Sequence, residues 1–431
     1  MYRRTVSLTG SFFGMQEALL LACFANNPYL CADLQLNCNF VKCAYMDMIN
    51  RDLKLAIEAA LPYFPVITVT GPRQSGKTTL CRNLFRELPY INLEKTRVRE
   101  AVMLDTEKYL YEYPDGLIID EAQQYPDLFS YIQVAVDENP SRRYILTGSS
   151  NFSLLEKITQ SLAGRTALFT LLPLSLHELG DRKHDISTDT LILNGGYPAV
   201  WAKNTPRELF YGNYYSTYIE RDVRQIIHVK DVNQFQTFIR LTAGRIGTEC
   251  NAAALSNEVG VVTNTIKQWF SVLAASYIIY MLPPYYENIG KRLVKSPKVY
   301  FYDTALACYL LGIETEAQLA VHPLRGALFE NMVVNEALKE RYNAGKRPDL
   351  FFYRDRSQKE VDLIQTKAND LHLYEIKSSK TYHKEFYKGI DYLKNIFGER
   401  ITRSALIFDG DTEIPSVRNG VYNFRDFRLM E

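Results

Sequence analysis

A glycine-rich run between residues 71 and 79 has the residue types and spacing of a phosphate-binding loop. It matches G-x-x-x-x-G-K-[ST] at every fixed position, after an apolar run and before a helical pattern. Glycines let successive backbone amides wrap a phosphate, and the following helix presents its positive N-terminus to the anion. Lys77 is expected to reach the β- and γ-phosphates of ATP, and the Thr78 hydroxyl is expected to bind Mg²⁺. The predicted cofactor-binding residues are Gly71, Pro72, Arg73, Gln74, Ser75, Gly76, Lys77, Thr78 and Thr79.

An acidic pair, Asp120 and Glu121, follows the apolar run 117–119. A buried strand there would deliver Asp120 beside the loop, where it is expected to hold Mg²⁺ through water. Glu121 comes next and is the expected general base for the water that attacks the γ-phosphate. The alternative is two solvated acids at the end of a strand.

Two further positions are candidates for the same reaction. The polar run 147–151 follows an apolar run, and Asn151 or Ser150 is expected to orient the water or sense the γ-phosphate. A simple turn or helix cap is the alternative. Arg165 is expected to stabilise the charge of the transition state, from the same chain or from a neighbouring subunit. A surface salt bridge is the alternative for Arg165, and Arg73 is a weaker candidate for its task.

A second group of charged residues near the C-terminus has the form D-x(n)-E-x-K. Side chains alternate along a strand, so Glu375 and Lys377 share one face, and a hairpin would place Asp362 opposite Glu375. The two carboxylates are expected to hold Mg²⁺, with Glu330 as a ligand through water, while Lys377 positions or deprotonates a water. This resembles the PD-(D/E)xK arrangement of restriction-endonuclease-like proteins. The alternative is a retained fold for DNA or protein contact, in which Glu375 and Lys377 form only a salt bridge.

The elements that must position these residues follow from short apolar runs. Such runs separated by helical patterns predict a three-layer α/β domain with a parallel sheet that ends near Gly180. Its expected strands are 66–70, 90–93, 117–119, 144–147 and 167–172. Residues 181–245 are expected to be mostly helical, with tyrosines that pack in the core. A helix at 326–342 and strands at 350–353, 360–365 and 371–376 are expected in the last domain.

Between these regions the pattern predicts a winged helix-turn-helix. Helices at 252–258 and 263–273 flank a turn, and strand-like runs at 277–282 and 298–302 follow. Exposed polar side chains on the second helix and basic ones in the wing are expected to contact DNA. Packing against other domains is the alternative. These side chains are Thr263, Asn264, Lys267, Gln268, Lys291, Arg292 and Lys295.

Composition limits the function classes. The chain has 431 residues and a net charge of +1, so only local patches could attract DNA. Seven cysteines without a C-x-x-C pair predict neither a zinc site nor a redox motif, and they suit a reducing cytoplasm. No apolar stretch approaches the roughly 18 residues of a membrane span, so no membrane partner is expected. Residues 1–45 form an atypical extension with a weak signal-peptide character, expected to be poorly structured or to reflect a mis-called start.

Taken together, these motifs resemble a family of prokaryotic AAA-type ATPases with a C-terminal domain of unknown function. The resemblance covers about residues 46 to 400 and rests on the runs 71–79, 117–123, 146–150, 162–165, 195–198, 218–222, 329–331 and 375–379. It implies an ATPase module, a winged-helix segment and a nuclease-like C-terminal fold. It also suggests rings, that is, homo-oligomers. The expected partition is an extension at 1–45, the ATPase domain at 46–180, a helical connector at 181–245, the winged helix at 246–318 and the nuclease-like domain at 319–431.

The resulting hypothesis is a cytoplasmic, Mg²⁺-dependent ATPase that couples ATP hydrolysis to DNA association. Two alternatives remain open at this stage. One is an ATP-driven regulator of protein partners whose nuclease-like domain is catalytically silent. The other is a DNA binder without cleavage, whose ATPase sets its residence time.

Overall fold

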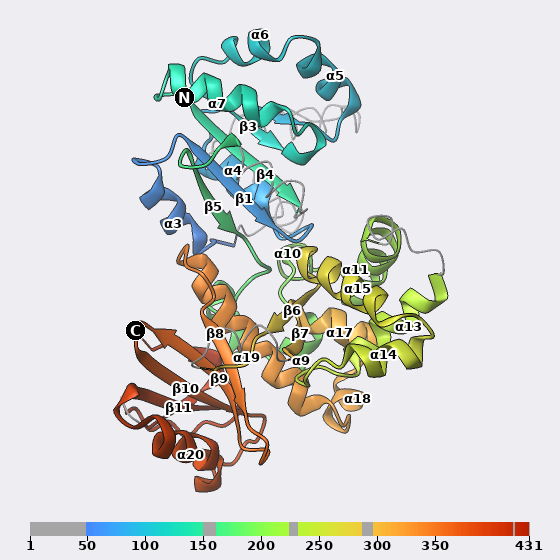
Figure 1. Cartoon of the computed structure of the whole chain (residues 1–431), viewed down its shortest axis with the longest axis vertical. Coiled ribbons are helices and arrows are strands. Elements are labelled where there is room, and N and C mark those ends of the chain that lie inside the picture. Colours follow the sequence, from blue (N-terminus) through green and yellow to red (C-terminus); the bar gives the residue numbers. More distant parts are fainter. Residues whose placement is uncertain (1–48, 150–160, 224–231, 287–295, 417–418, 431) are drawn as a thin grey trace, which may run out of the picture. The chain divides into compact units, whose positions relative to one another are not determined.

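The computed structural model describes residues 49–430 apart from 150–160, 224–231, 287–295 and 417–418 (Figure 1). Several predictions from the sequence fall outside these residues. They are those for the extension at 1–45 and for Ser150, Asn151, Lys291, Arg292 and Lys295.

A five-stranded parallel sheet with the order β2-β3-β4-β1-β5 forms the first domain. Its central strands are buried along their whole length, which explains their nearly continuous apolar sequence. The expected parallel sheet is therefore confirmed. The strands are β1 (Val66–Gly71), β2 (Tyr90–Asn92), β3 (Gly116–Asp120), β4 (Arg143–Ser149) and β5 (Thr166–Thr170).

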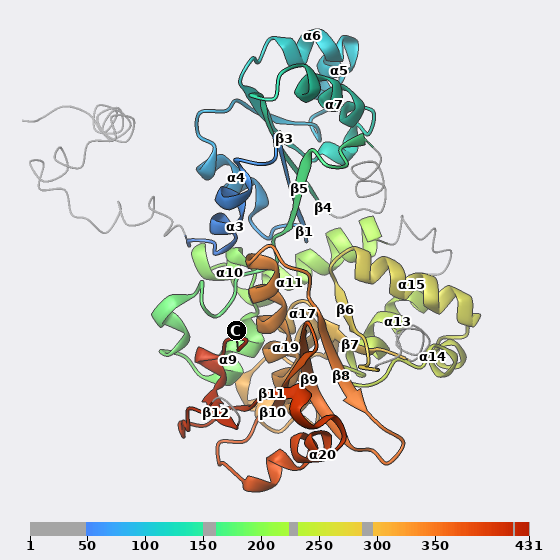
Figure 2. The ribbon, with the colours of Figure 1, turned by 60° about the vertical axis from the view of Figure 1, so that its left-hand side comes forward.

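Helices cover both faces of this sheet. Leu117 and Ile119 pack into one apolar cluster with α7, whereas Ile118 packs into another with α3 and α4, because neighbouring strand residues point to opposite faces. The two clusters make the three layers that are visible in Figure 2. The helices of this domain are α3 (Leu53–Ala60), α4 (Lys77–Leu84), α5 (Thr96–Leu104), α6 (Thr106–Tyr111), η2 (Ala122–Gln124) and α7 (Leu128–Glu138).

The middle of the chain is mostly helical, as expected. Its tyrosines are core residues: Tyr197, Tyr211 and Tyr214 are buried, and the Tyr197 hydroxyl donates to the Tyr214 hydroxyl at 2.8 Å. A nine-residue π-helix continues α11. The elements are η3 (Gly180–Lys183), α9 (Thr188–Asn194), α10 (Pro198–Ala202), α11 (Arg207–Tyr214), η4 (Tyr215–Val223) and α13 (Val232–Ala243).

Two helices and an antiparallel strand pair follow in the predicted order. Gly260 separates the helices with φ +77°, a conformation that glycine adopts without strain. The elements are α14 (Ala252–Val259), α15 (Thr263–Ala275), β6 (Ile279–Leu282), β7 (Lys298–Phe301), α17 (Thr304–Leu311) and α18 (Glu316–Ala320). Their identity as a winged helix stays a prediction.

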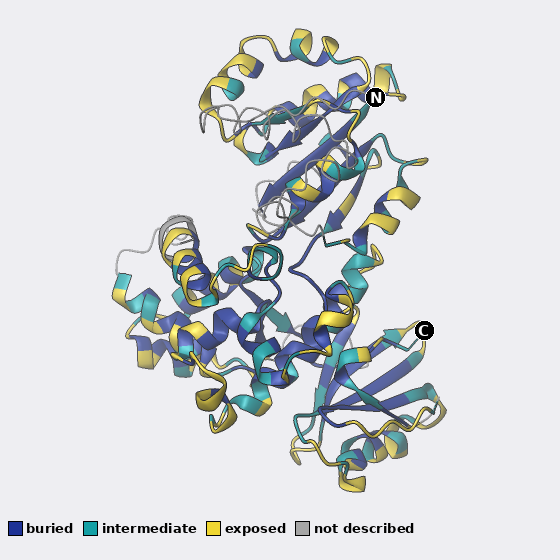
Figure 3. Ribbon diagram, turned by 180° about the vertical axis from the view of Figure 1, so that it is seen from behind, coloured by how far each residue is buried: buried dark blue, intermediate teal, exposed yellow. Residues whose placement is uncertain are grey.

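A second five-stranded sheet, with the order β12-β11-β10-β9-β8, forms the C-terminal domain. Its strands β8 to β10 are antiparallel, and β10 to β12 are parallel. Both sheets are largely buried, while the outer sides of the helices are exposed (Figure 3). The main elements are α19 (Arg325–Asn343), β8 (Leu350–Arg354), β9 (Glu360–Lys367), β10 (Asp370–Lys377), α20 (Lys388–Phe397), β11 (Ile401–Phe408) and β12 (Gly420–Asn423). Single 3-10 turns lie at η5 (Lys384–Tyr387), η6 (Gly398–Arg400) and η7 (Phe424–Asp426).

No helix in the described part of the chain combines the length and apolar character that crossing a membrane requires.

Candidate nucleotide-binding site

The loop between β1 and α4 takes the shape of an anion-binding nest. Gly71, Gln74 and Gly76 have φ values of 140°, 62° and 97°. A Cβ atom at Gly71 would lie 2.2 Å from the carbonyl oxygen of Leu171, so only glycine fits there. A loop that alternates between left- and right-handed residues turns several backbone amides toward one point, which suits a phosphate.

Lys77, the first residue of α4, lies in the centre of this loop. Its ammonium donates to the carbonyl oxygens of Gly71 and Pro72 at 3.0 and 2.8 Å. Burial lowers the pKa of Lys77 to about 8, although the nearby Glu121 and Asp120 oppose that shift. The Ser75 hydroxyl is buried and has no hydrogen-bond partner among the described residues. An orphaned donor beside a buried ammonium fits a triphosphate in the loop.

Asp120, at the end of β3, faces the start of α4. The Thr78 hydroxyl lies 3.1 Å from each of its carboxylate oxygens, and the Tyr90 hydroxyl donates to Oδ2 at 2.7 Å. The Thr147 hydroxyl donates to Oδ1. Burial and then the bond to Asp120 raise the pKa of Tyr90 to about 12, so this phenol remains a donor.

The donor set at this position fits Mg²⁺. Hydroxyl and carboxylate oxygens are its usual protein ligands, and it keeps several waters and phosphate oxygens. In the described part of the chain, no group of three or more His, Cys, Asp or Glu residues has metal-binding geometry. Thr78 and Asp120 are therefore the residues that would hold the ion.

Glu121 follows directly in a left-handed conformation, with φ 55° and ψ 46°. Such a backbone is uncommon for a residue with a Cβ atom and costs roughly 1 kcal/mol or more, and residues of this kind cluster at functional sites. The Ser149 hydroxyl donates to its Oε2 at 3.2 Å, and the Gln123 amide donates to the same oxygen. No role was predicted from the sequence for Gln123 or Ser149, and the predicted Ser150 and Asn151 lie outside the described residues.

Arg165 does not join this site within the chain. Its carbonyl oxygen accepts from the amide of Val66, the first residue of β1, whereas the phosphate loop follows the last residue of that strand. Its guanidinium holds both carboxylate oxygens of Asp137 at 2.6 and 2.7 Å. Within this chain, Arg165 therefore forms the surface salt bridge that the sequence analysis gave as its alternative role. The guanidinium of Arg73 lies 5.4 Å from the ring centre of Tyr218.

The predicted C-terminal residues come together. The antiparallel pairing of β9 and β10 runs as far as Leu363 and Tyr374. The next residues, Asp362 and Glu375, both contact Lys377. The Lys377 ammonium lies 3.1 Å from the Asp362 carboxylate and 2.6 Å from that of Glu375, and the Ile376 amide also donates to Asp362, at 2.8 Å.

The acids of this cluster are paired with lysines. Lys298 of β7, only 1% exposed, lies 3.0 Å from the Glu330 carboxylate and also pairs with Glu360. Glu330, which was predicted to bind a metal ion through water, thus forms an ion pair with the Lys298 ammonium. Lys298 was missed because a single lysine in an apolar strand carries no motif. Burial, and secondarily Asp362, raise the pKa of Glu375 to about 8, although Lys377 opposes that shift.

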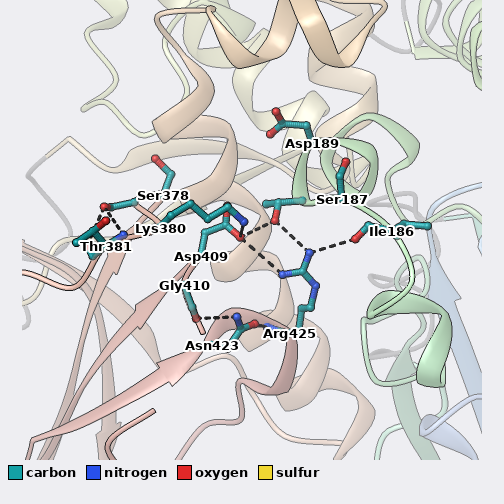
Figure 4. Close-up of polar contacts among 12 residues, drawn as sticks. Ile186, Ser187, Asp189, Ser378, Lys380, Thr381, Asp409, Gly410, Asn423 and Arg425 are labelled. Carbon is teal, nitrogen blue, oxygen red and sulfur yellow. Dashed lines mark hydrogen bonds and ion pairs between the residues drawn. The ribbon is translucent and has the colours of Figure 1, made fainter. Parts of the chain in front are cut away.

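The second helix of the helix pair presents a polar face. Asn264, Lys267 and Gln268 are exposed, whereas Ile266 and Phe270 are buried. A separate buried carboxylate, Asp409, follows β11 and binds side chains from the start of α9 and from the C-terminal domain (Figure 4). The Thr188 hydroxyl, the Lys380 ammonium and the Arg425 guanidinium contact it at 2.5, 2.9 and 3.6 Å.

Comparison with known families matches three successive segments. Residues 63–180 match the AAA domain, residues 185–317 match a domain of unknown function, DUF8612, and residues 325–426 match a domain of unknown function, DUF4143.

Relatives with similar sequences are two mycobacterial proteins. Uncharacterized protein Rv2008c of Mycobacterium tuberculosis and uncharacterized protein Mb2031c of Mycobacterium bovis are each 30% identical over 383 residues, which cover 87% of this chain and 83% of theirs. Among solved structures, a Walker-type ATPase of Pyrococcus abyssi aligns with 62% of this chain and 97% of its own, at 16% identity and a TM-score of 0.40.

Proposed function

Because the chain belongs to the same family as these two mycobacterial proteins and carries an AAA domain at residues 63–180, we propose that it hydrolyses ATP with Mg²⁺. The observation that carries the proposal is the contact of Thr78 with Asp120 directly before the strained Glu121. It joins a phosphate loop, an oxygen pair for a metal ion and a candidate base at one edge of the sheet.

Each residue has a task in this proposal. The loop amides and the Lys77 ammonium would bind the β- and γ-phosphates, while Thr78 and Asp120 would hold Mg²⁺, which would neutralise charge on the triphosphate. Glu121 accepts a proton from the attacking water. Ser149 and Gln123 hold its carboxylate in place through hydrogen bonds to Oε2.

Phosphate release from MgATP tests the proposal. Wild-type protein should release phosphate, and Lys77→Ala should bind ATP poorly and release almost none. Lys54→Ala is the control, because this exposed lysine on α3 pairs with Glu58 in the next turn of the same helix. Equal turnover by Lys77→Ala and wild type would overturn the assignment.

We further propose that ATP hydrolysis is coupled to DNA association through α15. Exposed Asn264, Lys267 and Gln268 on one helix face support this, and Lys291, Arg292 and Lys295 are proposed to assist. DNA should stimulate ATP turnover, and Lys267→Ala should weaken DNA binding and lower its salt dependence. Unchanged DNA binding by this variant would remove the proposed contact.

The lysine pairing of the C-terminal acids favours a nuclease-like domain that does not cleave. Lys298 already pairs with Glu330, and Lys377 already pairs with Asp362, although both carboxylates would have to hold Mg²⁺. The test is incubation of varied DNA and RNA substrates with wild type, ATP and Mg²⁺. Cleavage that disappears in Asp362→Ala would contradict this silent role and support the nuclease alternative.

A further inference from the structure

Arg51, which lies before α3 and outside the phosphate loop, makes an unusual set of contacts. Its guanidinium donates to the carbonyl oxygens of Ser75 and Leu172, both at 2.6 Å, and to the carboxylate of Glu178 at 2.9 Å. The Arg51 side chain is 7% exposed and that of Glu178 is fully buried. A buried arginine that binds two backbone carbonyls and one acid is held in a single orientation.

The carbonyl of Ser75 belongs to the peptide that carries the amide of Gly76. A trans peptide is planar, so its C=O and N–H point in opposite directions. A peptide between Ser75 and a glycine with φ +97° can rotate easily, because glycine has no Cβ atom to oppose the rotation. Fixing the Ser75 oxygen against Arg51 therefore fixes the direction of the Gly76 amide, on the opposite side, toward the phosphate position.

The anchor behind Arg51 is itself held firmly. Glu178 also accepts from the amides of Asp52 and Ser175, at 2.8 and 2.9 Å. The adjoining segment is bound by α19, because Glu336 accepts from the Leu176 amide at 2.7 Å and Lys339 donates to the Leu174 carbonyl at 2.8 Å. The Arg51 guanidinium thus connects the phosphate loop, through hydrogen bonds, to a segment that is itself fixed in place.

We propose that Arg51 is a positioning residue for nucleotide binding, which locks the Ser75–Gly76 peptide so that the Gly76 amide faces the triphosphate. This rests on the proposed function of the loop and adds a residue outside the motif. Because Arg51 acts through the loop backbone, it should increase the affinity for a nucleoside diphosphate and for a nucleoside triphosphate by the same factor.

Equilibrium titration with MgADP and with a non-hydrolysable ATP analogue tests the proposal. Arg51→Ala should lower the affinity for both nucleotides by a similar factor, about tenfold, because the charge-assisted hydrogen bonds that fix the loop are lost. Arg51→Lys should recover part of the affinity, because an ammonium can still donate to the Ser75 carbonyl. In turnover, KM should rise more than kcat falls, since bound and reacting nucleotide use the same amide.

The matched control is Arg341→Ala. Arg341 also donates to a backbone carbonyl and a carboxylate, at 2.8 and 2.9 Å, with a side chain that is 15% exposed. The Arg341→Ala variant should bind MgADP and the ATP analogue with wild-type affinity. If Arg51→Ala does not fold, Arg51→Lys is compared with Arg341→Lys, and only Arg51→Lys should lose ADP affinity.

Three results would overturn the positioning role. The first is that Arg51→Ala binds both nucleotides with wild-type affinity. The second is a loss of affinity for the ATP analogue alone, which would mean that Arg51 contacts the γ-phosphate directly. The third is an equal loss of affinity in the Arg341→Ala control. A wild type that binds ADP but releases no phosphate from ATP would overturn only the proposed hydrolysis. A wild type that binds neither nucleotide would overturn both.

Discussion

The Thr78 hydroxyl lies 3.1 Å from both carboxylate oxygens of Asp120, across two elements that are far apart in the sequence. The parallel sheet sets this contact, because β3 ends at Asp120 on the same edge of the sheet from which β1 continues into the phosphate loop and α4. It places a hydroxyl and a carboxylate where a metal ion bound to a triphosphate would need them.

The first prediction concerns this pair. Asp120→Asn keeps the size of the side chain but removes its charge, so the Mg²⁺ concentration for half-maximal ATP turnover should rise about tenfold or more. Binding of ADP without Mg²⁺ should change little. Asp137→Asn is the control, because this exposed acid pairs with Arg165 at the other end of the sheet. Equal Mg²⁺ dependence in Asp120→Asn and wild type would contradict the metal assignment.

The second prediction is a pH dependence of nucleotide binding. The triphosphate binds the charged form of Lys77, whose pKa is lowered to about 8 by burial. Above this pH the free protein loses the proton, so nucleotide affinity should fall as pH rises, by up to about tenfold per unit, and binding should take up a proton. Calorimetry in buffers of different ionisation enthalpy measures that uptake. Affinity that is constant from pH 7 to pH 9.5 would contradict it.

The third prediction concerns stability and Glu375. Burial raises its pKa from 4.5 to about 8, so between these values the folded protein holds a proton that the unfolded chain releases. Stability should therefore fall as pH rises through this window, because the folded state binds more protons. Glu375→Gln mimics the protonated form and should flatten the dependence of the melting temperature on pH. An identical pH dependence in wild type and variant would contradict the buried carboxyl.

The fourth prediction tests the loop geometry at Gly71. An added Cβ atom would lie 2.2 Å from the Leu171 carbonyl oxygen, in backbone that cannot move without breaking the sheet. Gly71→Ala should therefore lower the free energy of unfolding by at least about 2 kcal/mol. Gly244→Ala is the control, because its nearest neighbour would be 3.5 Å away. Denaturant unfolding of both variants measures the difference, and equal midpoints would contradict this geometry.

Much of the fold was predictable because it depends on local patterns. Continuous apolar runs identified the strands of the first sheet, and the alternation in β9 and β10 predicted that Asp362 and Glu375 lie together, as their shared contact with Lys377 shows. The loop between β1 and α4 was predictable for the same reason, since the spacing of its glycines follows from backbone geometry alone.

The partners of these residues could not be predicted in the same way. Arg51 reaches Ser75 and Leu172, and Lys298 reaches Glu330, through contacts between segments far apart in sequence. Neither residue stands in a recognisable pattern, and a lone arginine or lysine is usually a surface residue. Arg165 directly precedes β5, which runs parallel to β1, so it lies at the edge of the sheet opposite the phosphate loop. Only the strand order and strand directions reveal this position.

The central claim is that Glu121 activates water for attack on ATP bound at the loop. Steady-state phosphate release by Glu121→Gln at saturating MgATP tests it most directly. We expect a kcat at least about 100-fold below that of wild type, with nucleotide affinity retained, because the amide cannot accept the proton. A variant that turns over ATP at the wild-type rate would contradict it.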